Sequence, residues 1–221
     1  MRRLLCITLL AFGLTPAIAS AGPVHVVLDQ TVNAGQAIGD VDIFDLDLDA
    51  DGTDDLTFVS QTTQPTARTE WAAFVQSNSG TTRFLAGGAR LSAGDAIGAG
   101  GNYSSAPAYF VQTFFSPDIY IQGLWRQSNQ PGTTGFLGIE LDIGGNAHYG
   151  WIQIEVPREG VFFDNEIRVI DFAYESVAGA VIQAGTTTGG ASNVPAPGAV
   201  ALLLIGLLAG SARRARSPRS L

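Results

Sequence analysis

The sequence contains no lysine and only one cysteine, Cys6, which lies in an apolar stretch near the N-terminus. A single cysteine excludes an internal disulfide, and the two histidines do not form a Cys/His metal pattern. No glycine-rich phosphate-binding loop occurs, so the usual sequence sign of a nucleotide site is missing. Long apolar runs are also missing, because none reaches the roughly 20 residues that a membrane-spanning helix prefers.

Charge is distributed unevenly along the chain. All 12 basic residues are arginine; two lie near the N-terminus and four after residue 209, which leaves 12 − 6 = 6 for the rest. All 20 acidic residues lie in the range 29–175, so this part carries a net charge of 6 − 20 = −14. Such a balance argues against nucleic acid as a partner and suits an exported protein or a cation binder.

Residues 1–21 have the pattern of a secretory signal peptide. A pair of arginines precedes an apolar stretch from Leu4 to Leu14, a proline ends this stretch, and small residues follow. This order predicts cleavage by signal peptidase after Ala21, with Ala19 as the second choice. Cys6 would leave with the signal peptide, so the exported protein would have no thiol chemistry.

The C-terminal segment 194–217 combines an extended element, an apolar run over 198–209 and a basic end. The residues that define this pattern are Val194, Pro195, Pro197, Arg213 and Arg214. The two prolines hold the backbone extended, and the apolar run after them is free to become helical. The run is short for a permanent anchor but sufficient for transient insertion into the inner membrane. The basic end predicts a cytoplasmic C-terminus by the positive-inside rule.

This order resembles the PEP-CTERM sorting signal, which the membrane protease exosortase recognises in many Gram-negative bacteria. Ala196 stands where that family usually has an acidic residue. The resemblance implies that the protein is exported across the inner membrane, held there transiently, cleaved by exosortase and delivered to the cell surface or the extracellular polysaccharide matrix. The alternative is a plain C-terminal anchor that stays uncut.

Residues 22–185 are predicted to form one domain, followed by a Thr/Gly/Ser linker over 186–193. Short apolar runs between Gly, Asn and Ser turns indicate an all-β fold. The main predicted strands cover residues 24–28, 41–48, 56–60, 71–76, 83–85, 109–115, 119–125, 136–143, 148–156 and 166–174.

The densest chemistry lies between two of these strands, where eight carboxylates fall between Asp40 and Asp55. The pattern Asp-x-Asp-x-Asp-Gly-x-x-Asp matches the first nine positions of an EF-hand calcium loop, with Gly52 at the sharp turn. The candidate ligands are Asp47, Asp49, Asp51, the carbonyl of Thr53, and Asp55. Phe58 takes the twelfth position instead of the bidentate Glu, and strands flank the loop. We expect a weak structural calcium site; the alternative is a solvated acidic turn that binds nothing.

A second resemblance covers most of the exported part. The segments LSAGDAIG, LGIELDIGGNAHYGWIQIEV, VIDFAYES and VIQAG are similar to exported bacterial proteins with an HYGW strand and a terminal AYE…AG element. To our knowledge the function of this group is not established. The resemblance implies a β-sandwich, which we expect to be jelly-roll-like.

Two functional alternatives remain open. A carbohydrate-binding module could present aromatic rings to sugars, and the candidates are Tyr103, Tyr109, Tyr120 and Trp125. The stretch Glu140-Leu-Asp142-Ile143 resembles the catalytic strand of laminarinase-type β-sandwich glycosidases, which implies a secreted glycosidase as the other alternative. Gly144 or Gly145 stands where that pattern has its second Glu, so Glu155 on the neighbouring strand would have to replace it. His148 is predicted to be a structural hydrogen-bonding residue. The leading interpretation is a non-catalytic surface or matrix protein.

Mass spectrometry of the protein from its exporting cells tests the two terminal assignments. We expect the N-terminal peptide to begin at Gly22 and the C-terminal peptide to end within residues 194–197. A C-terminal peptide that still contains Leu221 would instead identify the segment as an uncut anchor.

Overall fold

The computed structural model describes residues 22–35, 37–64, 69–116, 118–123, 125, 133–157 and 166–188. All regular elements in these ranges are β-strands, as the composition predicts. None of these residues forms a helix that is long and apolar enough to cross a membrane. The predicted signal peptide and sorting segment lie outside the described residues.

One sheet has five strands in the order β10-β9-β4-β3-β2, all antiparallel. Its members are β2 (Val41–Leu46), β3 (Leu56–Thr63), β4 (Thr69–Ser77), β9 (Ala108–Ser116) and β10 (Asp118–Gln122). Leu56 and Phe58 of β3 are fully buried in the main core. At the free edge, by contrast, Ile43 of β2 is 55% exposed.

The other sheet has seven strands in the order β1-β13-β12-β11-β5-β8, and β6 also pairs with β11. Its members are β1 (Pro23–Val32), β5 (Arg83–Leu85), β6 (Arg90–Leu91), β8 (Tyr103–Ser104), β11 (Thr133–Ile143), β12 (Asn146–Val156) and β13 (Ile167–Glu175). Gly144 and Gly145 join β11 to β12 with φ of 60° and 82°. Positive φ at both positions is what a tight two-residue hairpin requires, so the predicted antiparallel return is confirmed.

The strand order differs from the jelly-roll order expected from the sequence. In the five-stranded sheet β2, β3 and β4 are successive neighbours, as are β9 and β10, and in the seven-stranded sheet β11, β12 and β13 follow one another. These are meander segments, and crossovers place β9 beside β4, β13 beside β1 and β5 beside β11, whereas a jelly roll contains two Greek keys. Short connections favour pairing between consecutive strands, which accounts for the meander segments.

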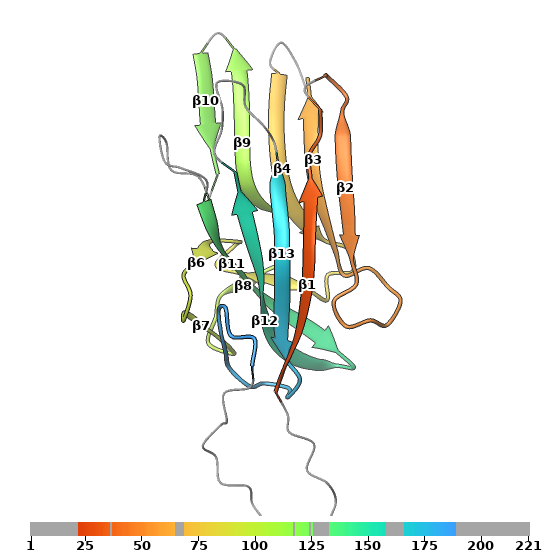
Figure 1. Cartoon of the computed structure of the whole chain (residues 1–221), viewed down its shortest axis with the longest axis vertical. Helices are drawn as coiled ribbons and strands as arrows, with labels where there is room; N and C mark the ends of the chain where they lie inside the picture. Colours follow the sequence, from red (N-terminus) through yellow and green to blue (C-terminus); the bar gives the residue numbers. More distant parts are fainter. Residues whose placement is uncertain are drawn as a thin grey trace, which may run out of the picture.

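The two sheets face each other in a β-sandwich-like arrangement (Figure 1). Their inner faces contribute to one continuous core: Phe58 and Phe110 come from the five-stranded sheet, and Ile139, Ile152 and Ile154 from the seven-stranded sheet. All five of these side chains have no exposed surface. Burial of this apolar area is the main source of the domain's stability.

A second cluster, here called the outer cluster, covers the opposite face of the seven-stranded sheet. It comprises Ile97, Phe136, Tyr149, Trp151, Ala173, Ile182 and Ala184. Two short strands, β7 (Ala96–Ile97) and β14 (Ile182–Gln183), pair with each other above this face. Trp151 meets the ring of Phe136 edge-on, with centroids 5.3 Å apart. The sheet is therefore apolar on both faces.

The described chain begins and ends at the same end of the molecule, the lower end in Figure 1. There the hydroxyl of Ser176 donates to the carbonyl of Gly22 over 2.8 Å. The β2–β3 loop, residues 47–55, projects from the side of the sandwich, at the lower end of the five-stranded sheet (Figure 1).

Candidate metal centre

The β2–β3 loop is anchored in the core at both ends. Leu46 and Leu48 are 6% and 3% exposed, and Leu56 is fully buried. The backbone N–H of Asp55 donates to the carbonyl of Leu46 over 2.9 Å, which closes the loop. Gly52 has a φ of 90°, in keeping with its predicted role at the sharp turn.

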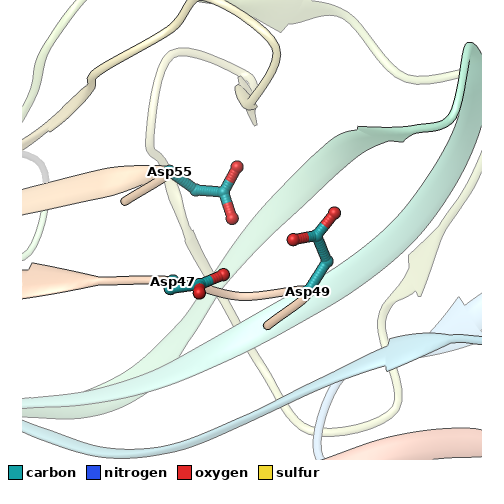
Figure 2. A group of neighbouring side chains, drawn as sticks. All are labelled: Asp47, Asp49 and Asp55. Carbon is teal, nitrogen blue, oxygen red and sulfur yellow. The ribbon is translucent and has the colours of Figure 1, made fainter. Parts of the chain in front are cut away.

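Three carboxylates of this loop meet at one point (Figure 2). Asp47, Asp49 and Asp55 each place a carboxylate oxygen within 4.8 Å of the other two, and all three side chains are half-buried. Hydrogen bonds fix two of them: the N–H of Gly52 donates to Asp47 Oδ2 over 2.8 Å, and the N–H of Leu48 donates to Asp55 Oδ2 over 2.9 Å. Asp47 Oδ1 is buried and has no hydrogen-bond partner.

The other two predicted ligands lie outside this group of three. Asp51 and Thr53 are exposed, and Asp51 Oδ1 accepts the N–H of Thr53 over 2.7 Å. The N–H of Asp51 donates to Asp49 Oδ1 over 3.1 Å. Asp51 therefore helps to shape the loop, while the three half-buried aspartates form the candidate centre.

The electrostatics of the centre favour the uptake of positive charge. Burial raises the pKa of Asp55, the hydrogen bond from Leu48 opposes this rise, and the negative charges of Asp49, Asp47 and Asp51 add to it. Three close carboxylates, one of them with an orphaned buried oxygen, could hold a metal ion. An oxygen-only ligand set suits hard cations such as calcium or magnesium.

The negative charges of the three aspartates also affect a tyrosine of the seven-stranded sheet. Burial raises the pKa of Tyr174 on β13, and the charges of Asp49, Asp47 and Asp55 raise it further. The sequence gives no sign of this influence, because Tyr174 lies more than a hundred residues after the loop and on the other sheet.

The aromatic residues predicted to face a sugar are scattered. Tyr103 lies in β8 against the outer cluster, its ring stacks on Tyr149 at 5.8 Å, and its hydroxyl donates to the carbonyl of Gly98 over 3.1 Å. Burial, followed by the charges of Tyr149 and Glu140, raises the pKa of Tyr103 to about 12. Tyr109 in β9 is 37% exposed. The side chain of Tyr120 is outside the described part of the chain.

The prediction for Trp125 was wrong. Its side chain is 1% exposed, and its indole N–H donates to the carbonyl of Gly88 over 2.8 Å. The ring meets Phe110 edge-on, with centroids 5.3 Å apart. From the sequence alone, an aromatic residue after a short strand can be placed either in the core of a sandwich or on its surface. Tryptophan has the largest apolar side chain, and here its burial favours the core position.

The carboxylates of the glycosidase alternative do not come together. Glu140 pairs in register with Tyr149, six residues from Glu155 on β12, which places the two carboxyl-bearing residues roughly 20 Å apart along the strand. Retaining chemistry needs about 5–5.5 Å. Glu140 is 8% exposed and bound by Arg83, while Glu155 lies 3.3 Å from Arg168. Glu155 therefore cannot replace the missing catalytic Glu.

His148 has the structural role predicted for it. Its ring is 8% exposed, and its Nδ1–H donates to the carbonyl of Glu175 over 2.7 Å. The residues of the predicted sorting signal (Val194, Pro195, Pro197, Arg213 and Arg214) lie outside the described residues.

No protein-family model matches the chain, and neither curated proteins nor solved structures give a match.

The raised pKa of Asp55 predicts a specific dependence of stability on pH in chelator-treated protein. The folded state binds this proton more tightly than the unfolded chain, whose carboxyl titrates near 3.8. Stability is therefore gained as the pH falls through the raised value. Asp55→Asn removes the charge yet still accepts the N–H of Leu48, so the variant should melt above the wild type at about pH 7, and this difference should shrink toward about pH 4. Circular-dichroism melts of the wild type and of Asp55→Asn at the two pH values measure this difference. A difference in melting temperature that does not change with pH would contradict the raised pKa of Asp55.

Proposed function

We propose that this chain is an exported, non-catalytic surface or extracellular-matrix protein whose β-sandwich is stabilised by a calcium ion in the β2–β3 loop. In this proposal residues 1–21 are a signal peptide. Segment 194–217 inserts briefly into the inner membrane as a short helix and is then cleaved by exosortase. The observation that carries the calcium assignment is the convergence of Asp47, Asp49 and Asp55.

Calcium suits this centre better than the alternatives. The loop offers carboxylate and backbone oxygens, whereas zinc and copper prefer histidine and cysteine. Magnesium demands a near-ideal octahedron, while calcium accepts irregular oxygen shells of six to eight ligands. The orphaned Asp47 Oδ1 is available to such a shell. A site with this few protein ligands belongs in the weak extracellular range of about 10⁻⁴ to 10⁻³ M.

The role of the ion is structural. Leu46, Leu48 and Leu56 fix both ends of the loop in the core, which keeps the backbone that carries these carboxylates close together. A divalent cation would neutralise them in place. The non-catalytic part of the proposal is supported by Glu140 and Glu155, which are each engaged by an arginine and do not face one another.

Calcium should raise the melting temperature of the exported protein. At a concentration of ten times the Kd, a single site adds about 1.4 kcal/mol to the free energy of unfolding. For a domain of this size that corresponds to roughly 3–6 °C. The combined change Asp47→Asn and Asp49→Asn should abolish the shift, as measured by thermal melts with calcium and with a chelator.

Asp54→Asn is the matched control, because Asp54 is an exposed carboxylate of the same loop outside the group of three. It should keep the calcium shift. In chelator the double variant should be at least as stable as the wild type, since it relieves repulsion, so loss of the shift cannot be attributed to unfolding. A wild-type melt that calcium leaves unchanged would end the proposal.

A second candidate function is binding of extracellular polysaccharide on the outer face of the five-stranded sheet. One row of paired positions across this face is apolar: Ile43, Val59, Phe74 and Tyr109. The rings of Phe74 and Tyr109 lie 5.1 Å apart. The next row contains Gln61 and Gln112, and the amide of Gln112 already donates to the carboxylate of Glu70 over 2.5 Å. An exposed ring beside amides suits the apolar face and hydroxyl edges of a sugar.

Binding to a glycan array tests this second candidate. We expect Tyr109→Ala to abolish binding, and Val181→Ala, which shortens a 61% exposed side chain away from this face, to leave it unchanged. Equal binding by the wild type and Tyr109→Ala would remove this face from consideration.

A further inference from the structure

Strand β2 lies at a free edge of the five-stranded sheet (Figure 1). In the part of the chain that the structure describes, it has a neighbouring strand on one side only, which is β3. The carbonyls of Asp40 and Leu46, at the two ends of β2, accept backbone N–H groups from the side of β3. Because hydrogen bonding alternates along an antiparallel strand, the backbone groups of Val41, Ile43 and Asp45 point away from the sheet.

The contacts of β2 agree with this direction. The N–H of Ile43 donates to Oδ1 of Asp42, a side chain of its own strand, over 3.0 Å. The side chains of Val41 and Ile43 are 51% and 55% exposed, whereas Phe44 between β2 and the core packs inward. β2 therefore presents to solvent both outward backbone groups and aliphatic side chains. An edge of this kind is the surface to which an extended segment can add as a further strand.

The charge along this edge has one sign. None of the five strands of the sheet contains a lysine, an arginine or a histidine, whereas Asp42 and Asp45 lie in β2 and Asp40 directly precedes it. The partners of these carboxylates are neutral: Asp42 accepts the N–H of Asn33, and Asp45 accepts the hydroxyl of Thr57. Two antiparallel copies of β2 would bring aspartates beside aspartates, which is destabilising. The edge therefore disfavours a second copy of this chain and favours a segment with positive charge.

We propose that β2 binds an extended basic segment of a protein partner, which adds to the five-stranded sheet as an outer strand. The sequence of β2 defines the pattern of that segment, because side chains of paired strands lie opposite one another. For an antiparallel segment that runs from Asp45 back to Asp40, the successive positions are basic, apolar, apolar, basic, apolar and basic. Backbone hydrogen bonds supply the affinity, and the basic positions supply the specificity. This inference goes beyond the proposed function and does not depend on calcium.

Calorimetric titration of the exported protein with a synthetic peptide tests the inference. The probe is an end-capped peptide of the sequence Arg-Val-Val-Arg-Val-Arg, which follows the expected pattern. Its matched control has the same side chains but carries methyl groups on the backbone nitrogens of the third and fifth residues, which would donate to β2. We expect the control to bind at least about tenfold more weakly, because it keeps the charge and loses two backbone hydrogen bonds.

Ile43→Pro locates the binding on the protein. Proline removes the outward N–H of this residue and leaves the bonds to β3 in place, and edge strands tolerate proline at such positions. The variant should bind the peptide about tenfold more weakly than the wild type. Val27→Ala is the control, because it shortens a 70% exposed side chain on β1, an edge strand of the other sheet. It should bind the peptide like the wild type.

The pair of peptides decides the question on the wild-type protein, whether or not Ile43→Pro folds. An equal Kd for the two peptides would show that charge alone attracts them and would overturn the inference, as would a wild type that binds neither. A wild type that sediments as a dimer, and a folded Ile43→Pro that sediments as a monomer, would identify a second copy as the occupant and would also overturn it. None of these outcomes affects the calcium site, which the melts with and without the ion test.

Discussion

Burial of the two ends of the β2–β3 loop in the main core is the constraint that keeps its carboxylates close together. Leu46, Leu48 and Leu56 are buried in the main core, so the backbone at both ends of the loop cannot spread the charges apart. Backbone N–H groups bind some of the carboxylate oxygens, but they supply only partial positive charge. The packing of the sandwich therefore holds together three carboxylates that could bind a metal ion.

The seven-stranded sheet departs from the usual antiparallel pattern, in which one face is packed and the other is wet. Its outer face is covered by β7 and β14, which pack over Trp151. Three segments far apart in the sequence, LSAGDAIG, HYGW and VIQAG, meet in this outer cluster. Their apolar residues pack together and hold the last described segment of the chain onto the sheet.

Much of the fold could be predicted from the sequence, because strands and turns are local. Alternating apolar residues marked the long strands, and Gly52 marked the turn of the acidic loop. The site was predicted only in part, since the sequence cannot tell that Asp51 faces solvent while Asp49 turns inward. Relations between strands could not be predicted from the sequence, because the separation of Glu140 from Glu155 depends on the register of β11 and β12.

The outer cluster also determines how the domain would respond to tension. A pull on the chain beyond Thr188 is borne first by the bond from the Trp151 indole to the carbonyl of Thr186, and then by the bonds that join Ala184 to Gly94 and Asp95. These hydrogen bonds are few, and they lie one after another along the chain. β14 could detach while β2, β3 and β13 stay hydrogen-bonded in their sheets. Release of this segment would therefore leave the hydrogen-bonded sheets of the sandwich in place.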